Sequence, residues 1–494
     1  MSSSIPPAEP DDARAVAPVV GPATGDWPRW RVFPPIALGV IMATLDASVV
    51  NIALPTLQRT LRAPLSTVEW VALAYSLTLT GLLLTSGRLA DARGRRAVYG
   101  NGLLLFTLAS VLCGFAPSVG ALIALRVLQG VGAALVSANG SALLVQAFPL
   151  AERGRALGAF GAMVGVGLAI GPPLGGLVVA HASWRWIFFV NLPLGLLAWN
   201  LLQKRVPPDR PNVDAVALDG IPPLLWAGGL AGVMLALTRA PEHGLGDPFV
   251  LVAGIGGALL LTVFFVLQAN SPRPMLPLDL LFGPLGGAVT LTFLGQLLSV
   301  SVGFLMPLVL EETGGLSAAQ SGSWLAILPV AALFCAPLAG RLADRVGPRS
   351  LTVTGMALTA VGLGVLSRLG VMPAGMSLVL GLMLIGIGLG LFAVPNASAL
   401  LSLVPPERLG IATGLQGTTR SLGIATGIAL TGALATLRYH THAHAELHLG
   451  VPGGVDRMAF VLATRDTFFG LALLAVVAAW LAWRVRTPRA ATAH

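Results

Sequence analysis

The sequence predicts an all-α polytopic membrane protein with fourteen transmembrane helices arranged as 6 + 2 + 6. Three observations support this prediction. Hydrophobic residues make up 55% of the 494 residues and charged residues only 10%, whereas soluble domains carry about 25% charged residues. Apolar runs long enough to cross a bilayer recur along almost the whole chain. A pattern in the first half also returns in the second, in parallel order.

Each apolar run is long and hydrophobic enough to form a transmembrane helix. They cover residues 35–57, 68–90, 97–116, 119–148, 156–180, 186–202, 219–238, 249–269, 284–310, 318–340, 350–369, 375–404, 410–437 and 467–485.

The internal repeat divides these runs into two halves. The loop after the second run reads GRLADARGRR from Gly87, and the loop after the tenth reads GRLADRVGPR from Gly340. The number of residues between these two loops exceeds what six spans need, so two extra spans separate the halves. We expect two pseudo-symmetric bundles, as in secondary transporters whose substrate site lies near the midplane between parallel repeats. The expected units are a polar tail 1–33, a six-helix bundle 34–205, a linker with two extra helices 206–279, a second six-helix bundle 280–486 and a tail 487–494.

The basic residues predict the orientation in the membrane. Twenty of the 30 Lys and Arg residues lie in the tails and in the loops on the same side as the tails, and eight lie on the other side. The positive-inside rule therefore places both termini in the cytoplasm and the protein in the cytoplasmic membrane. Residues 1–33 contain Glu9, Asp11 and Asp12 and no basic segment before a short apolar core, so we read them as a cytoplasmic tail and not as a signal peptide.

Several classes of function are excluded. The net charge of +9 does not indicate nucleic-acid binding, because the arginines sit in short loops and form no patch. Lys204 is the only lysine and lies in LLQKRV, so the chain has no phosphate-binding GxxxxGK[ST] loop, and we expect no nucleotide. Transport would then use an ion gradient. No intramembrane His/Asp/Glu or Ser/His/Asp constellation indicates an enzyme.

Asp46 is the single acidic residue within the first apolar run. It lies about 16 Å from either end of the run 34–58, near the middle of a hydrocarbon core about 30 Å thick. A carboxylate at that depth costs several kcal/mol unless it faces the protein interior, so it indicates a proton or cation site. The alternative is a carboxylate that only bonds a neighbouring helix.

Arg126 is the predicted partner of Asp46. It lies about eight residues into the fourth span, in LIALRVLQGVGAA. A nearby cation favours an ionised carboxylate and burial favours a neutral one, so movement of Arg126 relative to Asp46 would change the proton affinity of the acid. The alternative role is a structural bond to carbonyl groups. Neither charge recurs in the second half. Aligning Pro55 with Pro307 places Leu298 at the position of Asp46, and an offset of 256 residues places Leu382 at the position of Arg126.

Two further patterns indicate moving parts. The fifth span reads GLAIGPPLGG, and small residues spaced four apart let two helices approach closely, while Pro172 removes a backbone donor. The repeated loops place Asp91 and Asp344 at span ends among arginines, where an acid can pair with an arginine or with the amino terminus of a neighbouring helix. The residues of these patterns are Gly167, Gly171, Pro172, Gly175 and Gly176, and Gly87, Arg88, Asp91, Arg95, Gly340 and Asp344.

In combination, LDASVVNIALP from Leu45, GRLADARGRR, LIALRVLQGVGAA, GLAIGPPLGG and WRWIFFVNLPLG from Trp184 resemble the fourteen-span drug:proton antiporters of the major facilitator superfamily. The resemblance covers residues 35–485 and implies the major facilitator fold. It further implies that Asp46 is the protonation site, that Arg126 takes part in proton transfer, that Asp91 belongs to an inner-gate motif and that Gly-Pro-x-x-Gly-Gly marks an antiporter. Ser48 departs from the threonine usual in the family.

We therefore expect proton-coupled efflux of drugs, antibiotics or other small amphipathic molecules by alternating access. Polar residues within spans are candidates for the substrate cavity, although each could equally bond a neighbouring helix. They are Asn51, Gln296, Asn396, Gln416 and Arg420.

The alternatives are proton-coupled uptake by symport, export of a single metabolite and a passive channel. We expect no cofactor beyond the proton gradient and no bound metal, although the loop HTHAHAELH, from His440 to His448, could bind zinc weakly. The expected partners are the lipid bilayer and a small-molecule substrate. Nothing in the sequence decides whether a periplasmic adaptor protein takes part.

Overall fold

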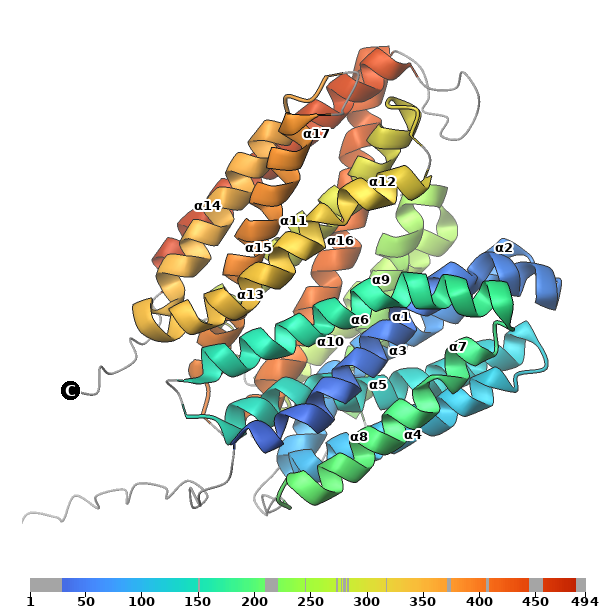
Figure 1. Cartoon of the computed structure of the whole chain (residues 1–494), viewed down its shortest axis with the longest axis vertical. Helices are drawn as coiled ribbons and strands as arrows, with labels where there is room; N and C mark the ends of the chain where they lie inside the picture. The colour runs from blue at the N-terminus through green and yellow to red at the C-terminus, as the bar shows by residue number, and fades with distance from the viewer. Residues whose placement is uncertain are drawn as a thin grey trace, which may run out of the picture.

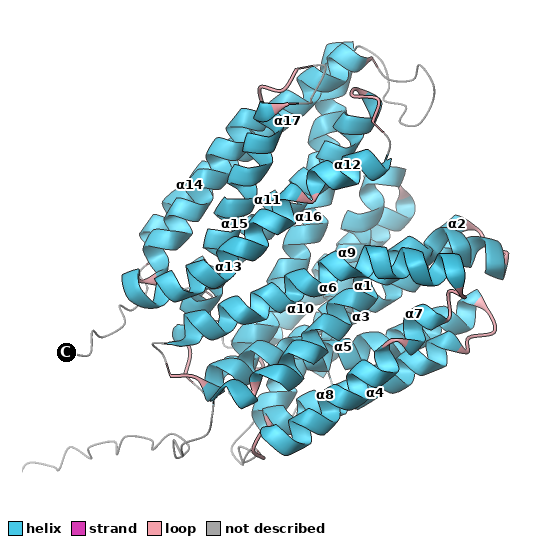
Figure 2. Ribbon diagram, viewed as in Figure 1, coloured by secondary structure: helices cyan, strands magenta, loops and turns pink. Residues whose placement is uncertain are grey.

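The protein was analysed as a computed structural model. It describes residues 29–149, 152–208, 221–244, 246–271, 274–276, 278, 281, 284–316, 318–370, 375–405, 408–443 and 456–485. Within these ranges the chain is helical with short connecting loops and contains no strand (Figure 2). Among the described residues, fourteen helical spans are long and apolar enough to cross a membrane, so the predicted fold class is confirmed.

The first half consists of α1 to α8, with the short helix η1 (Arg29–Arg31) before it. The bounds are α1 (Phe33–Leu61), α2 (Leu65–Val68), α3 (Trp70–Arg93), α4 (Arg95–Gly114), α5 (Val119–Ala147), α6 (Arg153–His181), α7 (Trp186–Phe189) and α8 (Asn191–Arg205).

The two extra helices and the second half follow. The bounds are α9 (Ile221–His243), α10 (Pro248–Ala269), α11 (Pro284–Glu312), α12 (Ala318–Leu325), α13 (Ile327–Val346), α14 (Pro348–Leu366), α15 (Met376–Ser402), α16 (Leu409–Ala443) and α17 (Arg457–Arg484).

The two halves approach one another at one end and diverge toward α2 and α12 (Figure 1). We call the end with η1 and the α3–α4 and α13–α14 turns the inner end, because the arginine distribution predicts that it is cytoplasmic. Gly94 and Gly347 occupy equivalent places in these two turns, with φ of 94° and 85°. Glycine is favoured at both because a side chain is strained at positive φ.

The extra helices fill the seam between α3 and α16. Helix α9 packs against both of them and also against α10. Trp226 of α9 lies in one apolar cluster with Leu84 of α3 and with Ile411 and Leu415 of α16. Helix α10 exposes much of its apolar surface, for example Val252 at 74%, as expected for a helix that faces lipid.

The predicted boundaries differ most from the structure around the loop between α16 and α17. Helix α17 begins at Arg457, ten residues before the predicted start at 467, because the carboxylate of Asp456 accepts hydrogen bonds from the backbone N–H groups of Met458 and Ala459. His440 and His442 lie in the last turns of α16 and not in a loop. His442 pairs with Asp466 at 3.1 Å, while His444 and His448 lie outside the described residues.

Candidate functional site

The two intramembrane charges of the first half meet inside its bundle. Arg126 of α5 donates a hydrogen bond from Nη1 to Asp46 Oδ2 of α1 at 2.6 Å, and the two side chains are 1% and 0% exposed. Burying a lone charge at this depth would be costly, so each charge offsets the desolvation of the other. The pair lies within the first half and does not bridge the two halves.

Two neutral amides complete the surroundings of the acid. Gln129 donates from Nε2 to Asp46 Oδ1 at 2.9 Å, and its own Oε1 accepts a bond from Arg126 at 2.6 Å. Asn191 of α8 donates to the same Asp46 oxygen at 3.1 Å and to Ser110 Oγ at 3.0 Å. An ionised carboxylate only accepts hydrogen bonds, whereas a protonated carboxyl also has an O–H to donate, so three donors around Asp46 suit its ionised form.

Arg126 is held from two further directions. Its Nε donates to the backbone carbonyl of Val71 at 3.0 Å, and its guanidinium lies over the ring of Tyr75, 4.1 Å from the centroid. Both residues belong to α3, the helix that contacts the second half at its inner end. A movement of α3 would therefore reach Arg126 directly.

Sequence reasoning found Asp46 and Arg126 but did not single out Gln129 or Asn191. Gln129 follows Arg126 by three residues and so shares its helix face, a spacing that could have indicated it. Asn191 stands in the segment WRWIFFVNLPLG and is fully buried. Its contact with Asp46 depends on the convergence of α1 and α8, which no local pattern reveals.

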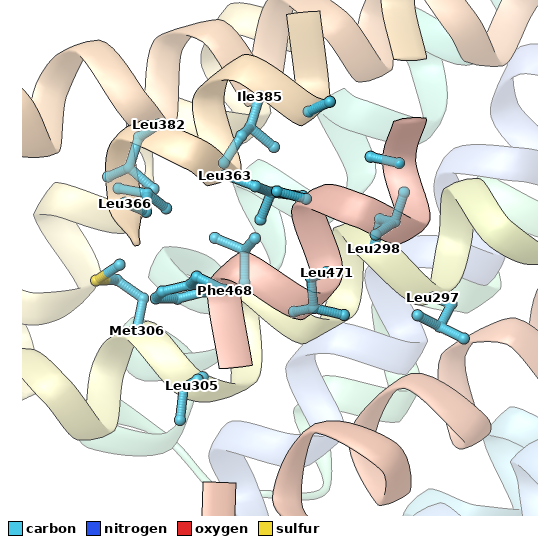
Figure 3. Close-up of a cluster of buried hydrophobic side chains, with 14 of the residues drawn as sticks. Leu297, Leu298, Leu305, Met306, Leu363, Leu366, Leu382, Ile385, Phe468 and Leu471 are labelled. Carbon is cyan, nitrogen blue, oxygen red and sulfur yellow. The ribbon is translucent and has the colours of Figure 1, made fainter. Parts of the chain in front are cut away.

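The second half has no such network at the equivalent place. Leu298 and Leu382, which counting set against Asp46 and Arg126, are both fully buried in an apolar cluster. Figure 3 shows them among Leu363, Phe468 and Leu471. The polar site is therefore a feature of one half only.

Helix α1 packs closely against the glycine row of α6. A Cβ at Gly167 would overlap Thr44 Oγ1, and a Cβ at Gly171 would overlap Ser48 Oγ. Gly175 faces Val49, whereas a Cβ at Gly176 would meet nothing within 4 Å. The helix continues through Pro172, whose side chain lies outside the described ones. Three of the four glycines thus set the distance between α6 and the helix that carries Asp46.

Asp91 joins the two halves at the inner end. Its carboxylate accepts hydrogen bonds from the backbone N–H groups of Gly410 at 3.0 Å and Ile411 at 3.1 Å, in the first turn of α16, and from Arg95 at 2.7 Å. An acid at a helix amino terminus satisfies otherwise unpaired donors and interacts favourably with the helix dipole. Arg88 instead donates to the carbonyl of Pro274, after α10, at 3.0 Å.

A second close approach lies at the pseudo-symmetric position. A Cβ at Gly87 would overlap the carbonyl of Gly410, and a Cβ at Gly340 would overlap the carbonyl of Gly154 in α6. The side chain of Asp344 lies outside the described ones. Backbone therefore meets backbone on two sides of the inner end, which is closed in this conformation.

The cavity candidates fall into different environments. Asn396 donates to Thr292 Oγ1 at 2.9 Å and to the carbonyl of Ala288 at 3.1 Å, so it bonds α15 to α11. Gln296 and Gln416 are half-buried and Arg420 is exposed. The side chain of Asn51 lies outside the described ones.

Fold and site together define a polytopic membrane transporter built from two six-helix halves, and not an enzyme. The profile of the Major Facilitator Superfamily matches residues 36–283 and 287–494, and the chain belongs to this family.

Curated relatives extend this comparison. The chain is 35% identical over 485 residues to the puromycin resistance protein pur8 of Streptomyces alboniger, covering 94% of this chain and 93% of that one. It is 29% identical over 452 residues to the riboflavin transporter RibZ of Clostridioides difficile, covering 90% and 96%. The human organic anion transporter MFSD10 has a similar structure, with a TM-score of 0.66 over 92% of this chain and 99% of that one, at 15% identity, which shows the fold alone.

Proposed function

We propose that this protein exports small amphipathic molecules, antibiotics among them, in exchange for protons across the cytoplasmic membrane, with both termini in the cytoplasm. One observation carries the proposal: the buried Asp46–Arg126 pair at 2.6 Å, present in one half and replaced by leucines in the other. The relationship to a puromycin resistance protein supports export of drug-like molecules.

The coupling step follows from the contacts of Asp46. In this conformation, with the inner end closed, the Asp46 carboxylate accepts hydrogen bonds from Arg126, Gln129 and Asn191. When the halves rock and α3 moves, Arg126 shifts with Val71 and Tyr75, and the buried carboxylate loses its cation. An unpaired buried charge is unfavourable, and uptake of a proton removes it.

Asn191 can serve both protonation states of Asp46. Its Nδ2 donates to the carboxylate, while its Oδ1 is buried and has no partner among the described residues. Rotation of the amide would present this oxygen to a protonated carboxyl, which donates. The site thus has a ready acceptor for the proton that it binds.

The energy source is the proton gradient. One charge that crosses a potential of 100 mV supplies about 2.3 kcal/mol, enough with a pH difference to concentrate a substrate. No nucleotide or other cofactor enters this scheme.

The test uses the full chain in proteoliposomes with an imposed pH gradient and puromycin as the first probe, alongside a resistance panel in a pump-deficient host. We expect Asp46→Asn to abolish gradient-driven accumulation and to keep counterflow exchange without a gradient. Asp466→Asn, which makes the same change on a partly exposed acid, should leave both unchanged. Resistance that survives Asp46→Asn would count against the coupling role.

Proton-coupled uptake is the second candidate, and the RibZ relative favours it. Labelled riboflavin distinguishes the two directions in the same proteoliposomes. Accumulation with the proton flux indicates symport, and accumulation against it indicates export.

A further inference from the structure

Arg420 is a charged side chain in the middle of a membrane-spanning helix, and it is exposed. It follows the start of α16 at Leu409 by eleven residues, which places it about 16 Å along the helix axis, near the midplane of the bilayer. A guanidinium at this depth costs several kcal/mol if it faces lipid. The direction in which it points therefore decides its role.

The contacts of α16 fix that direction. Thr413, Arg420 and Gly427 lie seven residues apart, nearly in line along one face, because seven residues make about two turns. Thr413 donates to the carbonyl of Ala138 in α5 at 2.5 Å, and Gly427 packs against Leu297 of α11. Arg420 thus lies on the face between a helix of the first half and a helix of the second.

The opposite face of α16 confirms this orientation. Ile411 and Leu415 lie about half a turn away from the Arg420 row and pack against Trp226 of the α9–α10 pair. On this side of α16 the exposed apolar surface belongs to α10, for example Leu259 at 62%. Arg420 therefore points toward the interior between the halves.

Other interior faces are exposed about one turn outward of Arg420, at the level of Ile424. Ser76 lies seven residues outward of Leu83, which contacts Gly417 of α16 at the inner end. Val127 lies eleven residues outward of Ala138 and is 41% exposed, and Ile424, one turn beyond Arg420, is 37% exposed. The halves that touch at Leu83 and Ala138 have thus separated at the level of Ile424, one turn outward of Arg420, and the exposed Arg420 side chain borders the space between them.

This cation has no partner of its own. Across the part of the chain that the structure describes, no hydrogen bond or ion pair to the Arg420 guanidinium is found, and the midplane acid Asp46 is bound to Arg126. The interior between the halves therefore carries an uncompensated positive charge.

We propose that Arg420 recognises an anionic group of the transported molecule, a carboxylate or a comparably acidic oxygen, so that the substrates include amphipathic organic anions. A planar guanidinium binds a carboxylate through two parallel hydrogen bonds. Two neighbouring amides add neutral donors. Gln416 is half-buried one turn inward of Arg420. Gln296 of α11 packs against Gly423, one turn outward of Arg420. This inference rests on the proposed function in taking the space between the halves as the substrate route.

The test measures binding without any ion gradient, so a failure of proton coupling does not affect it. The probes are 4-(1-pyrenyl)butyrate and its uncharged analogue 4-(1-pyrenyl)butyramide, and the readout is energy transfer from tryptophan to pyrene in the purified full chain. We expect the acid to bind at least about tenfold more tightly than the amide, since a hydrogen bond to a charged group contributes that much. Arg420→Gln should remove this preference without changing the affinity for the amide, and Arg420→Lys should keep part of it.

Arg438→Gln is the matched control, because it makes the same change on an exposed arginine near the outer end of the same helix. It should bind both probes like the parent protein. The proposal is overturned if the parent protein fails to bind the acid, if it binds acid and amide equally, or if Arg420→Gln weakens both to the same extent. The last result would indicate a structural role for the arginine.

Discussion

Asp91 of the first half accepts a hydrogen bond from the backbone N–H of Gly410 in the second half at 3.0 Å, so one acid near the end of α3 caps the helix that carries Arg420. Hydrogen bonds to a charged group contribute about 1.5 to 3 kcal/mol each. The contact therefore stabilises the conformation in which the inner end is closed.

Asp91→Asn should shift the protein toward conformations with an open inner end, because it removes the charge that favours the amino terminus of α16. Spin labels on Arg62→Cys and His440→Cys, at the outer ends of the two halves, report the change by pulsed electron resonance. We expect a larger population of short distances. An unchanged distance distribution would show that the contact does not control the inner end, and Asp247→Asn serves as the control.

Gly87→Ala should slow transport by tenfold or more, because its Cβ would overlap the carbonyl of Gly410 and backbone cannot move aside as a flexible side chain can. Gly340→Ala should act similarly through Gly154. Transport rates in proteoliposomes and the same spin-label pair test both. Gly364→Ala is the control, since a Cβ there would meet nothing within 4 Å, and a rate loss in this variant would contradict the steric explanation.

Within the glycine row of α6, Gly171→Ala should lower the thermal unfolding temperature and Gly176→Ala should not. The first Cβ would overlap Ser48 Oγ on α1, whereas the second would enter open space. Differential scanning fluorimetry of the purified proteins makes the comparison. Combining Gly171→Ala with Ser48→Ala should recover part of the loss, and no recovery would mean that the contact with Ser48 is not the cause.

Arg126→Leu should destabilise the protein by about 3 to 5 kcal/mol, because it leaves the Asp46 carboxylate buried without its cation. Adding Asp46→Asn should restore much of this stability, since it removes the unpaired charge. Chemical unfolding of the single and double variants measures the coupling. A double variant no more stable than Arg126→Leu would argue against a stabilising ion pair.

The fold class could be predicted because the length of the apolar runs, the distribution of arginines and the repeated loops can all be read from the order of residues, without knowledge of tertiary contacts. The sequence also singled out Asp46 and Arg126, because a charge within an apolar run stands out. Gln129 and Asn191 did not stand out, since neutral amides are common in membrane helices and their role appears only when α1, α5 and α8 converge. Arg420 was visible as a charge, but its exposure depends on the separation of the halves.

Helix α9 is wedged into the seam between α3 and α16, with Trp226 in contact with both sides. When one bundle tilts against the other, α3 and α16 must therefore move along the surface of α9. Helix α9 also separates this seam from the surrounding lipid, which leaves the opposite flank, beside α6 and α13, for lateral access of a lipid-soluble molecule to the space between the halves.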